Sequence, residues 1–110
     1  MRTNETDNNV FSLIVEWANE RDIIQGATTH AQLVKLLEEA GELAHGIGRH
    51  NEDLVKDSIG DCAVVLTILA AQFGFTFEEC VQTAYDQIKN RTGKKVDGIF
   101  VKDEEQQAND

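Results

Sequence analysis

The sequence predicts an all-α protein, a four-helix bundle with a short extended arm at its carboxyl end. Apolar residues recur at three- and four-residue spacing over four segments, which is the period of an amphipathic helix. The chain of 110 residues has no proline to interrupt a long helix. Hydrophobic residues make up 41% and charged residues 27%, which is typical of a globular domain with one core.

The first two predicted helices are joined by a short polar connection. The first spans residues 9–24, and Gly26 marks the stop that follows it. The second runs to about Ile47, with Thr28 or Thr29 as its amino-terminal cap. Its apolar stripe consists of Leu33, Leu36, Leu37, Ala40, Leu43, Ala44 and Ile47.

The third predicted helix, residues 52–73, is expected to be the most buried, because residues 62–71 are apolar on nearly every side. Gly74 fits the position just past its end. Thr76 and Glu79 form a capping box that begins the fourth helix, which runs to about Arg91.

The carboxyl end is expected to leave the helical pattern. Residues 96–99 read Val-Asp-Gly-Ile, which favours either a small hairpin or an extended arm. We therefore predict one helical domain over residues 1–101, followed by an acidic, disordered tail over residues 102–110.

The charge balance narrows the classes of partner. Twenty acidic and ten basic residues give a net charge of −10, which disfavours nucleic acid and anionic membranes as partners. A phosphate ligand would need a divalent metal to reverse the local charge. Residues 1–9 lack the apolar core of a secretory signal, and two cysteines make no disulfide framework, so we expect a cytoplasmic protein.

Two groups of carboxylates on neighbouring helices are the first candidate site. Glu38, Glu39 and Glu42 are expected on the face of the second helix opposite its leucine stripe, where a merely solvated acidic face is the alternative. Asp57 and Asp61 are one turn apart on the third helix, and Asp61 immediately precedes the apolar run. A carboxylate there is expected to be partly buried, paired with a basic residue or bound to a metal. The two groups together could form an oxygen-rich site for Mg²⁺.

Basic residues gather around the carboxyl end of the fourth predicted helix, at Lys89, Asn90, Arg91, Lys94 and Lys95, where Asn90 is the one uncharged member. Two explanations are equally open. Cations near a helix carboxyl end interact favourably with its dipole. Alternatively, the group is a phosphate clamp, in which Arg91 could bind bidentately. Trp17 on the first helix is expected in the core or in a pocket wall.

Several of these segments resemble a known family. Residues 35–44 read Lys-Leu-Leu-Glu-Glu-Ala-Gly-Glu-Leu-Ala, and residues 56–61 read Lys-Asp-Ser-Ile-Gly-Asp before an apolar helix. Residues 84–93 and 98–101 add the Asn-Arg segment and a Gly-Ile-Phe-Val ending. Together they resemble the MazG-like nucleoside triphosphate pyrophosphohydrolases, in particular the small single-domain bacterial and phage members, over roughly residues 17–101.

The resemblance implies a set of site residues. The family's first acidic motif, Glu-x-x-Glu, falls on Glu39 and Glu42, and its second, Glu-x-x-Asp, falls on Ser58 and Asp61. Ser58 thus stands where the family has glutamate, and Asp57 is a candidate substitute that points about 100° away. The family's asparagine and basic residues fall on Asn90 and Arg91.

The leading hypothesis is Mg²⁺-dependent hydrolysis of nucleoside or deoxynucleoside triphosphates to the monophosphate and pyrophosphate, with Mn²⁺ as a substitute metal. The metal ligands would be Glu39, Glu42, Asp57 and Asp61; Glu38 would orient or deprotonate the water; and Lys89, Asn90, Arg91, Lys94 and Trp17 would bind substrate. The alternatives are a non-enzymatic acidic protein that mimics DNA charge and an inactive family member.

The assembly is expected to be a homodimer or a dimer of dimers. The third predicted helix is apolar around its circumference, and one thin bundle covers only part of such a surface. A twofold partner would cover the rest, with the second and third helices near the axis.

Overall fold

The computed structural model describes residues 9–103, which form an all-α fold with a small hairpin. The described residues up to Phe77 form one compact unit, and those from Glu78 onward form a second. The elements in chain order are α1 (Val10–Glu20), α2 (Ile23–Gly26), α3 (Thr29–Gly48), α4 (Glu52–Gln72), α5 (Phe77–Ile88), β1 (Gly93–Val96) and β2 (Ile99–Lys102).

Polar side chains fix the beginnings of the first unit's long helices. Asn9, Thr28 and Asn51 each accept a hydrogen bond from a backbone N–H in the first turn of α1, α3 and α4, respectively. Such caps satisfy donors that a helix leaves unpaired at its amino end. At the end of α4, Gly74 adopts a φ of 84°, which confirms the predicted glycine stop.

The segment predicted as one helix over residues 9–24 is two helices. The chain breaks at Arg21 and Asp22, and Asp22 has a φ of 57°, in the left-handed region. The short α2 that follows is tied to α4, because the Gln72 side-chain amide donates to the backbone oxygen of Ala27 at 3.0 Å. Arg21 folds back over the Trp17 ring, 4.5 Å from the ring centre, and donates to the Trp17 carbonyl.

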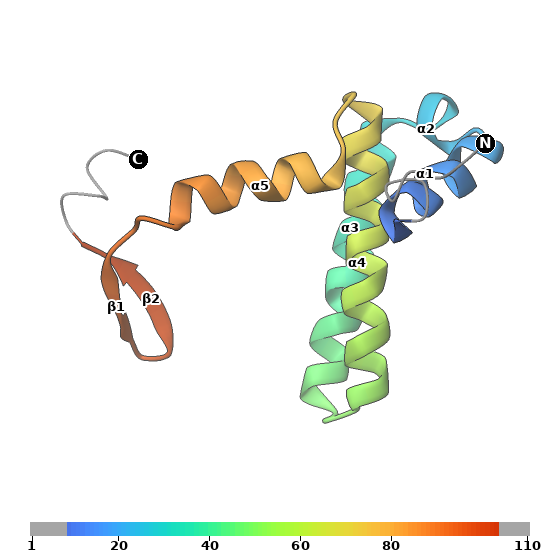
Figure 1. The fold of residues 1–110 in the computed structure, drawn as a ribbon. Helices are drawn as coiled ribbons and strands as arrows, with labels where there is room; N and C mark the ends of the chain where they lie inside the picture. Colours follow the sequence, from blue (N-terminus) through green and yellow to red (C-terminus); the bar gives the residue numbers. More distant parts are fainter. Residues whose placement is uncertain (1–8, 104–110) are drawn as a thin grey trace. The chain divides into compact units, whose positions relative to one another are not determined.

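Helices α3 and α4 form the main body of the first unit. They run side by side in opposite directions (Figure 1), and α1 packs against α4. Helix α4 is the most buried, as predicted, and its buried residues are Ser58, Val65, Thr67, Ile68 and Ala70. Gly46 allows the close approach of the two helices, because a Cβ there would lie 3.2 Å from side-chain atoms of Leu54 and Val55.

Helix α4 packs on one edge of the α3 apolar stripe rather than on its centre. Leu36, Leu43 and Gly46 are buried or half-buried along the edge that faces α4. We call this the inner edge. The outer edge consists of Leu33, Leu37, Ala40, Ala44 and Ile47, all exposed, with Leu37 64% and Ile47 60% accessible.

In the second unit, the region predicted as a hairpin or an extended arm is a hairpin. Strands β1 and β2 pair antiparallel, with Lys94 opposite Val101. Asp97 and Gly98 both have positive φ, 51° and 82°, which is the geometry of a two-residue type I′ turn. Lys102 belongs to β2 instead of the predicted tail, and residues 104–110 of that tail lie outside the described residues.

Within residues 9–103, none of the helices alone has both the length and the apolar character needed to cross a bilayer.

Candidate functional site

Two carboxylates meet between α3 and α4. The Glu39 side chain, only 14% exposed, lies on the inner edge of α3. Asp61 is half-buried on α4 and is in hydrogen-bonding contact with Glu39. Because the two helices run antiparallel, one carboxylate from each reaches the same level of the interface.

The position of Glu39 differs from the sequence expectation, which placed it with Glu38 and Glu42 on the face opposite the leucines. The difference follows from the off-centre packing of α4. The inner edge of the stripe borders Glu39 on the helix wheel, so packing there draws this side chain into the interface. Glu38 and Glu42 stay exposed, as expected.

The surroundings of Asp61 oppose its ionisation. Burial raises the pKa of Asp61 above its ordinary value of 3.8, and the hydrogen bond and negative charge of Glu39 raise it further. A side-chain hydrogen bond with Asp57 and the positive charge of Lys35 act in the opposite direction and lower this pKa in part. The predicted partial burial of Asp61 is therefore confirmed.

Lys35 is a charged neighbour that sequence reasoning did not single out. Its Nζ lies 3.6 Å from the Glu39 Oε1, one helical turn away on α3. The sequence left open that Asp61 is paired with a basic residue. Lys35 meets this alternative in part, because its charge acts on Asp61 while its ion pair is with Glu39. The signal in the sequence was the i,i+4 spacing of Lys35 and Glu39.

Ser58 and Asp57 occupy different environments. Ser58 is buried, with 1% of its surface exposed, whereas Asp57 is exposed. Ser58 precedes Asp61 by one turn on the same side of α4, so the antiparallel packing brings it to the level of Glu42 and Leu43. Ser58, the position that the resemblance matches to a glutamate, thus lies inside the helix interface, whereas Asp57 is exposed.

These carboxylates do not form a ready-made metal cluster. Across residues 9–103, no three side chains of His, Cys, Asp or Glu are gathered closely enough to hold a metal ion. The donor type still suits Mg²⁺, since hard cations bind carboxylate oxygens. The surroundings of Asp61 disfavour its negative charge, and a bound cation would offset that charge. A third ligand would come from a side-chain rotation, for which exposed Glu42 and Asp57 have room.

A hollow beside Asp61 joins apolar and charged residues. It has a volume of about 550 Å³, and α1 contributes Val10, Phe11 and Ile14 to its wall. The residues from α4 are Asp53, Lys56, Asp57, Gly60, Asp61, Ala63 and Val64. The sequence pattern indicated the apolar face of α1 but not the gap that it leaves against α4.

A second hollow continues the first one along α1. Its volume is about 340 Å³, and its walls are almost wholly apolar. Val10, Ile14 and Val64 line both hollows, and Leu13 and Trp17 complete the second. Trp17 is therefore part of a pocket wall, one of the two places expected for it. The two hollows make a groove between α1 and α4 that is charged at the Asp61 end and apolar at the Trp17 end.

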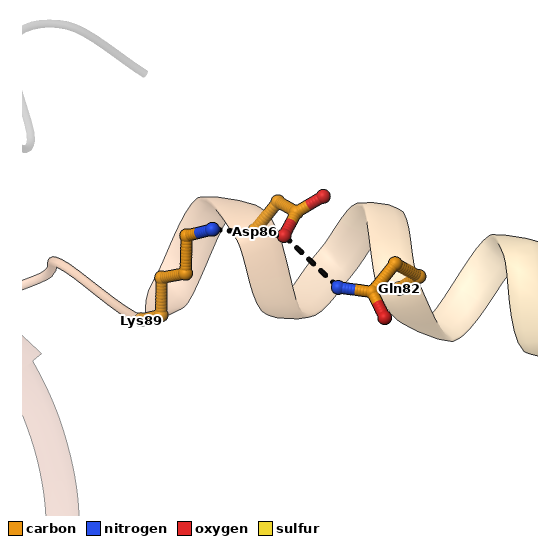
Figure 2. A network of polar contacts seen from close by, with 3 residues as sticks. All are labelled: Gln82, Asp86 and Lys89. Atoms are coloured by element: carbon orange, nitrogen blue, oxygen red, sulfur yellow. Dashed lines mark hydrogen bonds and ion pairs between the residues drawn. The ribbon is translucent and has the colours of Figure 1, made fainter.

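The predicted basic group lies in the second unit. Lys89 already has an acidic partner, because its Nζ lies 3.1 Å from the Asp86 Oδ1, which also accepts from Gln82 (Figure 2). Asn90 is exposed, Arg91 is half-buried, and Lys94 is exposed on β1. The predicted phosphate-binding residues therefore belong to the second unit, whereas the carboxylates of α3 and α4 belong to the first.

Comparison with known proteins identifies the family. An uncharacterized 18.2 kDa protein from the rep-hol intergenic region of Haemophilus phage HP1 (strain HP1c1) is 48% identical over 59 residues. This alignment covers 54% of the chain but only 36% of the phage protein. No solved structure matches the chain. Residues 27–96, more than half of the chain, match the model of the MazG nucleotide pyrophosphohydrolase domain. The chain therefore belongs to the MazG nucleotide pyrophosphohydrolase family.

Proposed function

We propose that this protein hydrolyses nucleoside or deoxynucleoside triphosphates to the monophosphate and pyrophosphate, in a reaction that depends on Mg²⁺. The observation that carries the proposal is the contact of Glu39 with Asp61 between α3 and α4, at the charged end of the α1–α4 groove. Membership of the pyrophosphohydrolase family supports the class of reaction.

The groove matches a nucleotide in its distribution of polarity. A nucleoside triphosphate has an apolar, flat base at one end and a charged triphosphate at the other. The apolar end of the groove, at Trp17, suits the base. The end at Asp61 suits the phosphates once a divalent cation has reversed the local charge.

The carboxylates would hold the metal. Glu39 and Asp61 are the pair that the helix packing brings together, and Glu42 and Asp57 would complete the ligand set. When bound, Mg²⁺ supplies positive charge that neutralises the triphosphate and polarises the α-phosphorus centre. The ion would also offset the repulsion between the neighbouring carboxylates of Glu39 and Asp61.

Other residues would orient the reactants. Glu38 is the candidate that accepts a proton from the attacking water, as the bond from the α-phosphorus to its bridging oxygen breaks and pyrophosphate leaves with the electron pair. Asn90, Arg91 and Lys94 would bind the outer phosphates, and Lys89 would do so in competition with Asp86. Mn²⁺ would replace Mg²⁺, since both accept oxygen ligands.

We also propose that the protein is a homodimer or a dimer of dimers. The outer edge of the α3 stripe is a continuous apolar surface, and Ile59 on α4 is exposed as well. A second copy packed on this surface would bury it. Leu33, Leu37, Ala40, Ala44 and Ile47 alternate at spacings of four and three, the pattern of helices that pack in pairs.

One observation favours a second candidate function, nucleotide binding without hydrolysis. Ser58 is buried where the family has a metal-binding glutamate, so the site has one carboxylate fewer at that point. A non-enzymatic, DNA-mimicking protein fits the net charge but leaves the burial of Asp61 and Glu39 without a role.

The test is incubation of the purified protein with a panel of ribo- and deoxynucleoside triphosphates, with Mg²⁺ and with EDTA. We expect pyrophosphate and the monophosphate in equal amounts, only with the metal, and no such release by the Asp61→Asn variant. Binding of nucleotide without pyrophosphate would favour the second candidate. Neither binding nor release would contradict both.

A further inference from the structure

Three glycines lie within the helical spans of α3 and α4 without a packing reason that requires them. Gly41 and Gly48 lie in α3 and Gly60 lies in α4. A Cβ built on any of the three meets no atom within 4 Å. Since glycine inside a helix is less favourable than alanine, each one lowers stability without an evident gain in packing.

Gly60 differs from Gly41 and Gly48 because it borders the groove between α1 and α4. It lines the hollow beside Asp61, between Asp57 and Val64 on the groove side of α4, and Gly41 and Gly48 line neither hollow described above. A side chain at Gly60 would therefore project into the open space of the groove, toward the wall formed by α1. A side chain at Gly41 would project into solvent.

We propose that Gly60 determines which ligands the groove admits, by keeping the α4 side of the groove flat next to Asp61. This inference rests on the proposed function. Gly60 lines the same hollow as Asp61 and is absent from the apolar hollow at Trp17, so the part of the ligand that passes it is the part next to the carboxylates, the α-phosphate and the adjoining sugar. Without a Cβ, the α4 backbone can be approached to van der Waals distance, as glycine permits at other close ligand contacts.

A role of Gly60 in ligand binding and a role in packing predict different changes in stability and affinity. A methyl group at Gly60 improves the helix and fills ligand space, so stability should rise while affinity falls. The same change at Gly41 improves the helix alone. A glycine kept for packing would instead lose stability on substitution.

The experiment compares Gly60→Ala with Gly41→Ala as the matched control. Nucleotide binding is measured by calorimetry with the α,β-methylene analogues of ATP, CTP, GTP and UTP in the presence of Mg²⁺, and stability by thermal unfolding without ligand. Both variants should unfold a few degrees higher, by about 3–6 °C. Gly60→Ala should bind the best of the four analogues about tenfold more weakly, and Gly41→Ala within about twofold of the unmodified protein.

The Gly60→Leu variant extends the series and should abolish detectable binding. Equal affinity of Gly60→Ala and the unmodified protein would overturn the role of Gly60 and leave the proposed function intact. A fall in the unfolding temperature of Gly60→Ala would overturn it too, because the methyl group would then be clashing with the fold. If the unmodified protein bound none of the four analogues, both this inference and the proposed function would fail.

Discussion

The two edges of the α3 apolar stripe have opposite environments. Along the inner edge, Leu36 and Leu43 pack toward α4, and Glu39 is drawn into the same interface. Along the outer edge, Leu37 and Ile47 are more than half exposed. One helix therefore buries a carboxylate while it leaves leucine and isoleucine in water.

The difference indicates that α3 is arranged for more than the stability of this unit. Packing α4 on the centre of the stripe would bury more apolar surface and leave Glu39 in solvent, which the hydrophobic effect alone would favour. The observed packing instead brings Glu39 against Asp61 and leaves the apolar outer edge exposed. Substitutions at the inner edge, at the outer edge and at Ser58 test this comparison, and the pH dependence of stability tests the contact of Glu39 with Asp61.

The largest expected effect is on catalysis, at the inner edge. Glu39→Ala, Glu42→Ala and Asp61→Asn should each lower the rate of pyrophosphate release by about 10²-fold or more, because each removes charge that would hold the metal. Far-UV circular dichroism should show unchanged helical content. A variant that keeps its rate within a few-fold would remove that residue from the metal-binding set.

The next effect is on assembly, at the outer edge. Leu37→Glu places a charge in the middle of the exposed stripe and should convert the proposed dimer to a monomer, as measured by light scattering at low micromolar concentration. His45→Glu is the matched control, since it adds a negative charge on the same helix but away from the stripe, and it should leave the mass unchanged. An unmodified protein that is monomeric yet hydrolyses nucleotides would contradict the proposed interface.

A third prediction concerns the buried serine. Ser58→Glu places a carboxylate inside the interface, at the position where the resemblance to the family implies one, and it should lower the free energy of unfolding of the metal-free protein by about 1–3 kcal/mol. It should also tighten Mg²⁺ binding about tenfold. Ser58→Gln has the same size without the charge, so Mg²⁺ should not recover its stability.

A Mg²⁺ titration of the variants distinguishes Asp57 from Ser58 as the residue that contacts the metal. If Asp57 takes the place of the missing glutamate, Asp57→Asn should weaken Mg²⁺ binding about tenfold and Ser58→Ala should change it less than about twofold. The opposite result would assign the metal contact to a water held by Ser58.

Most of the fold could be predicted from the sequence because local signals mark it. Thr28 caps α3, Gly74 ends α4, and the Asp97–Gly98 pair forms the hairpin turn, all at positions that short-range chemistry determines. The break between α1 and α2 has no such signal. Asp22 takes a left-handed conformation that glycine or asparagine more often marks.

The candidate site was predictable in part, for a different reason. Asp61 is next to an unbroken apolar run, so its partial burial follows from the sequence whatever the neighbouring helix does. The burial of Glu39 depends on which edge of a broad stripe packs on α4, and periodicity gives directions around a helix without choosing between edges. The groove was not predictable either, because it is the space that α1 leaves against α4.

The smallest effect expected is on stability as a function of pH, at the contact between Asp61 and Glu39. Burial, followed by the hydrogen bond and charge of Glu39, raises the pKa of Asp61 above 3.8 in the folded protein. Below pH 3.8 Asp61 is protonated in both states. As the pH rises past that value, the unfolded chain loses the proton first, so the free energy of unfolding falls until the folded pKa is passed and stays lower above it. Asp61→Asn removes this loss.

Without metal, the variant should therefore unfold at a higher temperature than the unmodified protein at neutral pH, and the difference should shrink toward zero near pH 3.5. Glu38→Gln, which removes an exposed carboxylate from the same helix as Glu39, is the control variant. Saturating Mg²⁺ should reverse the order at neutral pH, because an ion held by the Asp61 carboxylate would stabilise only the unmodified protein. A variant that is less stable than the unmodified protein at neutral pH without metal would mean that the Asp61 charge is compensated in the fold, and the argument for a cation at the inner edge would lose its electrostatic basis.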